Sequence, residues 1–210
     1  MPSLAQSERQ RLCETALLVG PDAPTLSGEW TVRDLLAHLV VRESDPVGAP
    51  GIVVEPLAFL TERRMRRLAR TDFADLVEKV RHPALWAPAR LPRLEHLLNT
   101  LEFFVHHEDI RRARPGWTGR PLPAADEKLL WSMIRTAGKG LTRRAPVGVR
   151  IENATTGSTA VLKDGDTLVT VRGLPSEISL FVFGRRPQAV VEVLGDPADV
   201  VSLSDHSLGI

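Results

Sequence analysis

The hydrophobic pattern of this chain changes once, close to residue 145, and that change limits the folds open to it. Up to this point apolar residues recur every three or four positions, the spacing of helices that bury one face. Beyond it apolar and polar residues alternate, as at Val147, Val149 and Ile151, which is typical of strands. The sequence therefore predicts an α + (α+β) fold, with a helical domain over residues 1–145 and a small α+β domain over residues 146–210.

The expected elements follow from apolar spacing and from capping and turn residues. The helices expected in the first domain are Ser3–Val19, Thr31–Ser44, Pro56–Val80 with a break near Thr71, Leu94–Ala113 and Ala124–Thr142. A proline-rich loop is expected over His82–Pro92. In the second domain Lys163–Asp166 is a hairpin turn signal between two strands, and a helix, a strand and a helix follow at Pro175–Phe183, Ala189–Leu194 and Pro197–Leu203.

Composition excludes several classes of protein. The 27 Lys+Arg and 26 Asp+Glu residues leave a formal net charge of +1, so no overall field attracts nucleic acid or anionic membranes. A single cysteine, Cys13, excludes an intramolecular disulfide and a cysteine-rich metal site. The start of the chain lacks an apolar signal region, and no stretch approaches the roughly 20 apolar residues of a membrane span. We expect a cytoplasmic protein without nucleic-acid or membrane partners.

The segment 101–110 carries a carboxylate and an imidazole four residues apart. Glu102 and His106 share one helix face, with Cβ atoms about 5–6 Å apart. Both side chains can then reach one divalent ion, and zinc is favoured because it accepts mixed His and Glu ligands. His107 lies roughly 140° around the helix from Glu102, against roughly 40° for His106, so His106 is the expected partner. The alternative is a hydrogen-bonded Glu–His pair on a helix surface.

A second polar group lies on the expected helix 31–44. Asp34, His38 and Arg42 form a narrow stripe opposite the broad apolar face of that helix. One interpretation is that this stripe faces water. The other is that it lines a pocket between helices, where His38 would be a third ligand. Three protein ligands and an open coordination position are typical of a catalytic zinc site.

These two motifs together carry a family resemblance. Trp30 followed by the segment Thr31–Leu39 (TVRDLLAHL), and then the helix motif from Glu102 to His106 (EFFVH), resemble the DinB-like metal-binding bundles. The chain is most similar to the branch that contains mycothiol-dependent maleylpyruvate isomerase. The resemblance implies a four-helix bundle whose metal is held at His38, Glu102 and His106. It also implies a sterol-carrier-like C-terminal domain.

Metal chemistry and the resemblance together indicate a function. An open divalent site can polarise a substrate oxygen or lower the pKa of a bound thiol. Neither motif contains a cysteine, so the thiol would be external, and the resemblance implies mycothiol. Arg150 and Arg172 are candidates for holding a substrate carboxylate, since arginine binds carboxylates bidentately. We expect a thiol-dependent isomerase or transferase acting on a small electrophilic substrate. The alternative is a non-catalytic metal- or small-ligand-binding module that keeps the same bundle.

Overall fold

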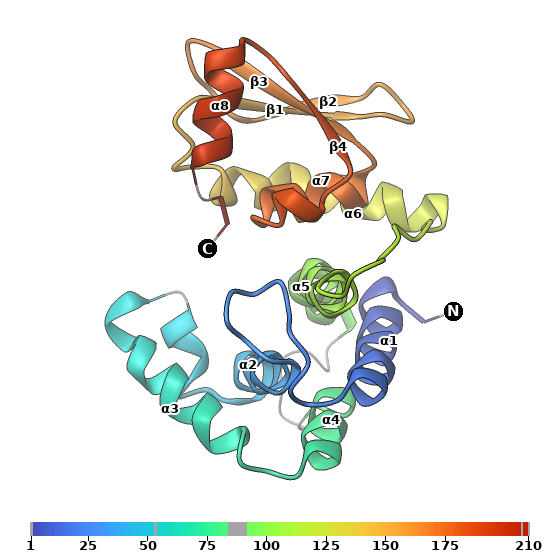
Figure 1. Ribbon diagram of the computed structural model, residues 1–210, viewed down its shortest axis with the longest axis vertical. Helices are drawn as coiled ribbons and strands as arrows, with labels where there is room; N and C mark the ends of the chain where they lie inside the picture. Colours follow the sequence, from blue (N-terminus) through green and yellow to red (C-terminus); the bar gives the residue numbers. More distant parts are fainter. Residues whose placement is uncertain (1, 53, 84–91, 207, 210) are drawn as a thin grey trace. The chain divides into compact units, whose positions relative to one another are not determined.

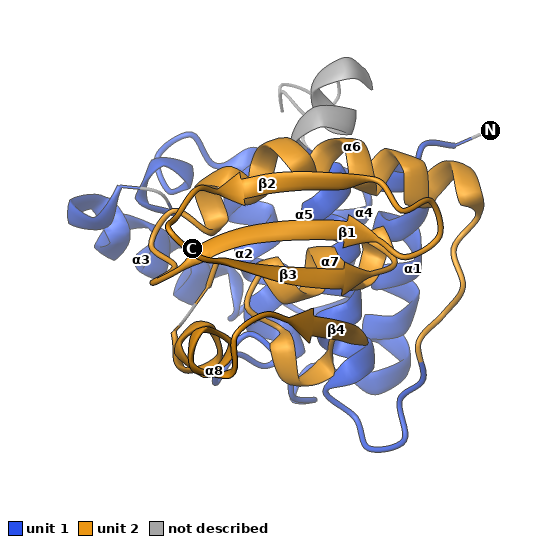
Figure 2. Cartoon of the chain, turned by 90° about the horizontal axis from the view of Figure 1, so that it is seen from above, with its two compact units in different colours: residues 1–118 blue, residues 119–210 orange. Residues whose placement is uncertain are grey.

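The computed structural model describes residues 2–52, 54–83, 92–206 and 208–209. The chain is mixed α/β and divides into two compact units, residues 1–118 and 119–210 (Figure 2). Most of the expected proline-rich loop, at residues 84–91, lies outside the described residues. Within the part of the chain that is described, no helix is long and apolar enough to cross a membrane.

The first unit is helical. Its helices are α1 (Leu4–Val19), α2 (Val32–Ser44), α3 (Ala58–Leu68), α4 (Phe73–Arg81) and α5 (Pro92–Arg112), with short 3₁₀ turns at Ala49–Ile52 and Glu55–Leu57 (Figure 1). Four of these helices, α1, α2, α4 and α5, contribute fully buried side chains to one core, among them Leu12, Leu36, Leu76 and Phe103. Burial of such apolar side chains supplies most of the favourable free energy of folding of a helical unit.

Local sequence signals set where these helices begin. Ser3 and Thr31 each accept a hydrogen bond from the backbone N–H three residues on, and the third residue bonds back, which makes a capping box at the start of α1 and α2. The break expected near Thr71 is confirmed, because α3 ends at Leu68 and Asp72 caps α4. Its carboxylate accepts hydrogen bonds from the backbone N–H groups of Ala74 and Asp75.

The second unit combines helices with a small mixed sheet. It contains α6 (Ala124–Leu141), β1 (Gly148–Asn153), β2 (Thr159–Lys163), β3 (Leu168–Gly173), α7 (Pro175–Val182), β4 (Val191–Leu194) and α8 (Pro197–Asp205), with a 3₁₀ turn at Arg186–Gln188. The strand order is β2-β1-β3-β4, and β1 pairs parallel with β3 and antiparallel with β2. Helices α6 and α7 lie side by side along one face of the sheet (Figure 1). The alternation expected in the first strand is confirmed, since Val149 and Ile151 are buried.

The expected hairpin at Lys163–Asp166 is wrong. The turn does join β2 to β3, but β1 lies between these two strands in the sheet. The connection passes across the start of β1 so closely that a Cβ at Gly165 would lie 2.6 Å from the Gly148 nitrogen. A Cβ at Gly148 would in turn lie 2.5 Å from the Thr167 carbonyl oxygen. Only glycine fits at these two positions, so Gly165, which suggested a tight hairpin turn, instead allows the chain to cross over β1 beside Gly148.

Helix α6 lies in the second unit, whereas the expected boundary at 145/146 assigns the same residues to the first domain. Its buried side chains Trp131 and Ile134 belong to one core with Val149, Ile151 and Leu162. The change in periodicity from helix to strand therefore lies inside this compact unit. A change in hydrophobic periodicity shows where helices end and strands begin. It does not show a domain boundary here, because one compact unit packs a helix on a sheet and so contains both periodicities.

Candidate metal centre

Three side chains from two helices of the first unit converge. His38 on α2 and Glu102 and His106 on α5 each offer one ligand atom, and these atoms all lie within 4.8 Å of one another. The Nε2 atom of His106 is 3.4 Å from a Glu102 carboxylate oxygen, and the two imidazole rings are 5.4 Å apart at their centroids. Both histidines are buried, each 8% exposed. His38 is therefore buried beside His106 of α5 and does not face water, contrary to one of the two interpretations of the polar stripe.

The N-terminal cap of α2 explains how His38 reaches this place. Asp34 is committed to the cap, where one oxygen accepts hydrogen bonds from the Thr31 N–H at 3.0 Å and the Thr31 hydroxyl at 2.7 Å. One turn later His38 lies against Trp30, with ring centroids 5.0 Å apart. The next member of the stripe, Arg42, has its Nε 3.4 Å from Glu102. The three residues of the stripe therefore have different roles. Asp34 caps the helix, His38 is a candidate ligand, and Arg42 is a cation beside the candidate ligand Glu102.

Asp109 completes the site, and the sequence analysis did not identify it. Its carboxylate is fully buried and lies 2.9 Å from His106 Nδ1. The Ser27 hydroxyl donates to the same oxygen at 2.8 Å. Because a carboxylate accepts, Nδ1 carries a proton, which leaves Nε2, on the side of His38 and Glu102, as the ring nitrogen that could bind a metal ion. The signal was its position three residues after His106, on the same helix face.

The charges at the site are strongly coupled. Burial opposes ionisation of Glu102, but a hydrogen bond with His106 and the charges of Arg42, His106 and His38 together lower the pKa of Glu102 to about 2. Burial also opposes protonation of His106, whereas its bonds to Asp109 and Glu102 raise the pKa of His106 to about 9. Without a cation other than these side chains, the site holds an imidazolium between two carboxylates. A divalent ion would take the place of that proton.

A chain of buried polar contacts anchors Arg42. Its Nη1 donates to Asn99 Oδ1 at 2.7 Å, and Asn99 Nδ2 donates to Glu43 at 2.6 Å. Glu43 in turn accepts two hydrogen bonds of 2.6 Å from the guanidinium of Arg9. The contacts link α1, α2 and α5 and end at Glu102. They hold a positive charge beside the candidate ligand.

His107 points to a different part of the unit. Its Nδ1 lies 2.8 Å from Glu8 and its Nε2 lies 3.1 Å from the Thr15 hydroxyl, both on α1. Its two ring nitrogens are therefore used in contacts between α1 and α5. This placement agrees with the angular argument that favoured His106 as the partner of Glu102.

The two candidate arginines lie in the second unit. Arg150 on β1 and Arg172 on β3 alternate with core residues, so both project from the sheet face opposite the buried Val149 and Val171. Arg172 lies 3.2 Å from Glu152 and 3.3 Å from Glu192. Arg150 has no ion pair within the described residues. The guanidinium of Arg172 is thus already engaged by carboxylates, whereas that of Arg150 is not.

Comparisons with known proteins identify solved structures with a similar fold. No family model matches the sequence, and no curated protein sequence matches it. The chain is similar to the crystal structure of the mycothiol-dependent maleylpyruvate isomerase, with a TM-score of 0.57 and 18% identity over 92% of this chain and 91% of that chain. A histidine-to-alanine mutant of that isomerase has the same TM-score and coverage at 17% identity. At these identities the similarity shows a shared fold along nearly the whole of both chains.

Proposed function

We propose that this protein is a divalent-metal and thiol-dependent isomerase or transferase that acts on a small electrophilic substrate. The observation that carries the proposal is the convergence of His38, Glu102 and His106, whose ligand atoms lie within 4.8 Å of one another. Asp109 adds a second argument, because metal-binding histidines usually donate their other N–H to a carboxylate. The fold shared with a mycothiol-dependent isomerase supports the same assignment.

The donor set fits a divalent ion. Two imidazole nitrogens and one carboxylate are ordinary zinc ligands, with bonds of about 2.0–2.2 Å. Glu102 keeps a second oxygen besides the one that faces Arg42. We propose zinc as the metal, since mixed His and Glu sites suit it, and ligand type alone also admits nickel, iron or manganese. The bound metal would supply a positive charge that lowers the pKa of a thiol beside it.

The thiol in this proposal is an external one. Cys13 is fully buried in the core of the first unit, and its Sγ faces the Val77 carbonyl oxygen at 3.8 Å. Burial, partly offset by nearby arginines, raises the pKa of Cys13 to about 11, so the side chain stays an unreactive thiol at neutral pH. We therefore propose mycothiol, the thiol named for the similar isomerase, as cosubstrate.

The chain's own residues would position the reactants. Asp109 and Ser27 fix the ring of His106, and Arg42 holds a positive charge beside Glu102 where an anionic group can be attracted. We propose unsaturated dicarboxylates as the substrate class, by analogy with maleylpyruvate. Arg150 and Arg172 remain proposals for holding a substrate carboxylate. Arg150 is favoured, because Arg172 already has two carboxylate partners.

We also propose the finer family assignment. The first unit would be a DinB-like four-helix bundle, which the core shared by α1, α2, α4 and α5 supports. The second part of the chain would be a sterol-carrier-like α+β domain. Limited proteolysis tests the proposed boundary at 145/146, because cleavage near Ala145 would support it, whereas cleavage near Thr118 would support the division between the two compact units.

The test combines metal analysis with thiol binding. Elemental analysis of the purified protein should give one divalent ion per chain, and calorimetry should show that mycothiol binds the metal-loaded protein with release of a proton. A chelator-treated sample and the Glu102→Gln variant should bind the thiol much less well. Isomerisation of maleylpyruvate or another unsaturated dicarboxylate should require both metal and thiol. Metal-independent thiol binding without proton release would overturn the proposal and favour the non-catalytic binding module.

A further inference from the structure

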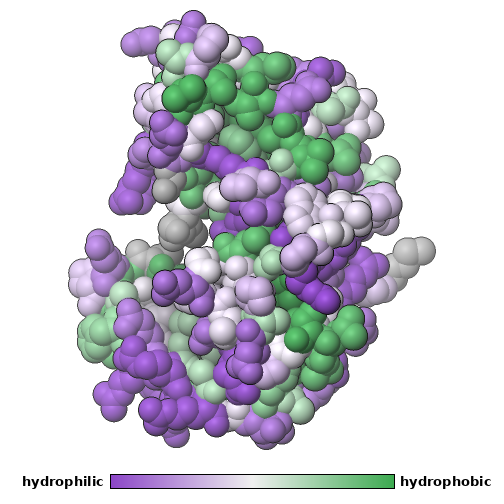
Figure 3. Space-filling view, viewed as in Figure 1, coloured by the Kyte–Doolittle hydropathy of each residue, from purple (hydrophilic) through white to green (hydrophobic). Residues whose placement is uncertain are grey.

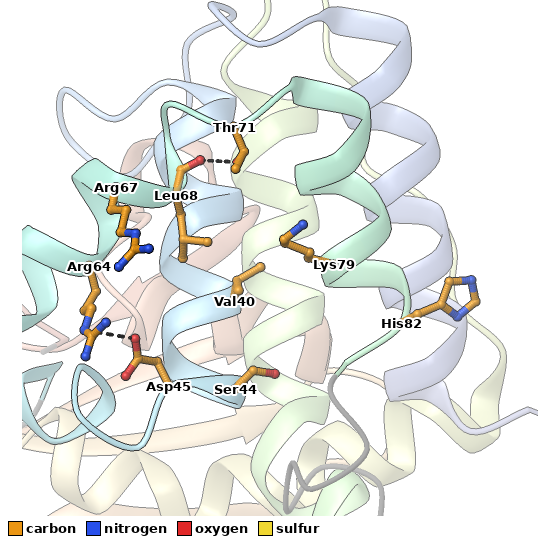
Figure 4. Close-up of a pocket in the computed structure, with 9 residues that line it drawn as sticks. All are labelled: Val40, Ser44, Asp45, Arg64, Arg67, Leu68, Thr71, Lys79 and His82. Carbon is orange, nitrogen blue, oxygen red and sulfur yellow. Dashed lines mark hydrogen bonds and ion pairs between the residues drawn. The ribbon is translucent and has the colours of Figure 1, made fainter.

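A cavity of about 550 Å³ lies in the first unit, bounded by α2, α3 and α4 (Figure 4). Its wall on α2 includes Val40 and Ser44, which lie about 200° and 240° around the helix from His38. The cavity therefore lies on a different face of α2 from the candidate metal centre. Its volume is within the range of about 300–1,000 Å³ found for small-molecule sites.

The wall of the cavity is positively charged. Arg64, Arg67 and Lys79 line it, with Asp45 as the acidic member. Asp45 is already neutralised, since one oxygen lies 3.3 Å from the Nε of Arg64 and the other accepts backbone N–H bonds of 2.9 Å from Val47 and Gly48. Among the described residues, Arg67 and Lys79 have no ion-pair partner. Arg67 and Lys79 are thus two cations in the cavity wall that are available to an anion.

These cations come partly from a basic cluster on and just after α3, over which hydrophilic side chains gather in Figure 3. The cluster consists of Arg63, Arg64, Arg66, Arg67 and Arg70. Several arginines on one helical segment most often form a solvated surface, so the sequence by itself predicts no site there. The structure divides it: Arg66 forms an exposed i, i+4 pair with Glu62, whereas Arg64 and Arg67 turn toward the cavity. Within this cluster, Arg66 is therefore paired at the surface, whereas Arg64 and Arg67 line the cavity.

Part of the cavity wall is apolar. Val40 and Leu68 are half-buried and pack against the core of the first unit, and Figure 4 shows both side chains directed toward the space that Lys79 also faces. The ring of His82 points away from these residues in the same view. A cavity lined by both apolar side chains and cations matches a ligand with an apolar body and an anionic head.

We propose that this cavity binds a small organic anion, a carboxylate or phosphate monoester joined to a short apolar group. The anionic head would lie between Arg67 and Lys79, and the apolar body would cover Val40 and Leu68. This site is separate from the metal centre and does not depend on metal or thiol chemistry. A carboxylate and a phosphate ester share the recognition chemistry, so both are used as probes.

The experiment is calorimetric titration of the full chain with phenyl phosphate and benzoate, with inorganic phosphate and neutral benzamide as controls. We expect saturable one-to-one binding of at least one aromatic anion, weaker binding of inorganic phosphate, and none of benzamide. Arg67→Gln and Lys79→Gln should each weaken binding about fivefold or more. Arg66→Gln, with the same charge change one residue away, should leave binding within about twofold. Val40→Thr should weaken the aromatic anions but not inorganic phosphate.

Three results would overturn the proposal. The first is the absence of saturable binding of either aromatic anion. The second is equal weakening by Arg66→Gln and Arg67→Gln, which would indicate a diffuse charge effect rather than a site. The third is loss of binding in the Glu102→Gln variant with no loss in Arg67→Gln, which would place the anion at the metal centre. Circular dichroism of each variant checks that the helices are retained.

Discussion

Asp109 accepts a hydrogen bond from Nδ1 of His106 at 2.9 Å, and this contact determines which ring nitrogen of His106 can bind a metal. The carboxylate itself is fully buried and held by the Ser27 hydroxyl. It therefore fixes both the tautomer and the orientation of the ring before any ion arrives. A histidine so oriented loses little rotational freedom on binding.

The first prediction concerns this contact. We expect Asp109→Asn to lower metal affinity about 10- to 100-fold, because the amide is a weaker partner for Nδ1–H than a carboxylate. Competition with a chromophoric chelator measures the affinity. Ser27→Ala, which removes only the hydroxyl that holds Asp109, should have a smaller effect in the same direction. Unchanged affinity in Asp109→Asn would mean that His106 does not bind the metal through Nε2.

The second prediction separates the two adjacent histidines. His106→Gln should abolish most metal occupancy, whereas His107→Gln should retain it, because His107 contacts Glu8 and Thr15 on α1. His107→Gln should instead lower the free energy of unfolding by about 1–3 kcal/mol through loss of a buried hydrogen bond. Elemental analysis and urea denaturation measure the two effects. Equal loss of metal from both variants would contradict the assignment.

The third prediction concerns the buried ion pair between Arg9 and Glu43. Both side chains are almost fully buried, and Arg9 also lies over the ring of Phe103 at 4.1 Å. Glu43→Ala leaves the guanidinium without its carboxylate, so we expect the free energy of unfolding to fall by about 3–5 kcal/mol. The double variant Arg9→Met, Glu43→Leu should recover much of that loss. If the double variant were as unstable as the single one, packing rather than an unpaired charge would explain the loss.

Helical segments of this chain were predictable because their signals are local. Thr31 and Asp34 mark the start of α2 within four residues, and Asp72 marks the break before α4. The i, i+4 spacing of Glu102 and His106 likewise predicted that they share one face of α5. The convergence of His38 with them rested on a family resemblance, since its own helix spacing fitted a solvated stripe equally well.

Other features depend on contacts that the sequence does not encode locally. The alternation in β1 shows that Val149 and Ile151 are buried, but it does not show that β1 pairs with β2 on one side and β3 on the other. The same limit applies to α6, whose apolar face could pack on helices or on a sheet. Asp109 was missed because it is one of several charged residues near the end of α5. Its only distinguishing feature in the sequence is its position three residues after His106.

The fourth prediction concerns the pH dependence of stability at Glu127. Burial raises the pKa of Glu127 above the ordinary 4.5, although hydrogen bonds from the N–H and hydroxyl of Ser176 oppose the rise. The folded state therefore holds this proton more tightly than the unfolded state. Its contribution to stability is present below pH 4.5 and is lost as the pH rises through the folded-state pKa.

Glu127→Gln removes that titration while keeping an oxygen that can accept a bond from Ser176. We expect the free energy of unfolding of the variant to fall less than that of the unchanged chain as the pH rises from 4 toward 7. Urea denaturation at several pH values measures the difference between the two. If the free energy of unfolding changed with pH in the same way for the variant and the unchanged chain, Glu127 would have the same pKa in the folded and unfolded states.

The fifth prediction uses the single cysteine. Because burial raises the pKa of Cys13 to about 11, alkylation by iodoacetamide at pH 8 should be far slower in the folded protein than in urea. Mass spectrometry of the intact chain follows the reaction without interference from another thiol. The same burial should prevent exchange of the Cys13 thiol with the oxidised disulfide form of mycothiol, a reaction that would release one mycothiol thiol. Rapid formation of that adduct in the folded protein would contradict the conclusion that Cys13 is unreactive.

The crossing of Gly165 over Gly148 also has a practical consequence for modifying this chain. The link between β2 and β3 has no room for a side chain at Gly148 or Gly165, since an added Cβ at either position would lie 2.5–2.6 Å from backbone atoms. An inserted tag or label there should prevent the sheet from closing. The turn at residues 154–158 between β1 and β2 is exposed throughout, so a fluorescent or affinity tag is best introduced at that turn.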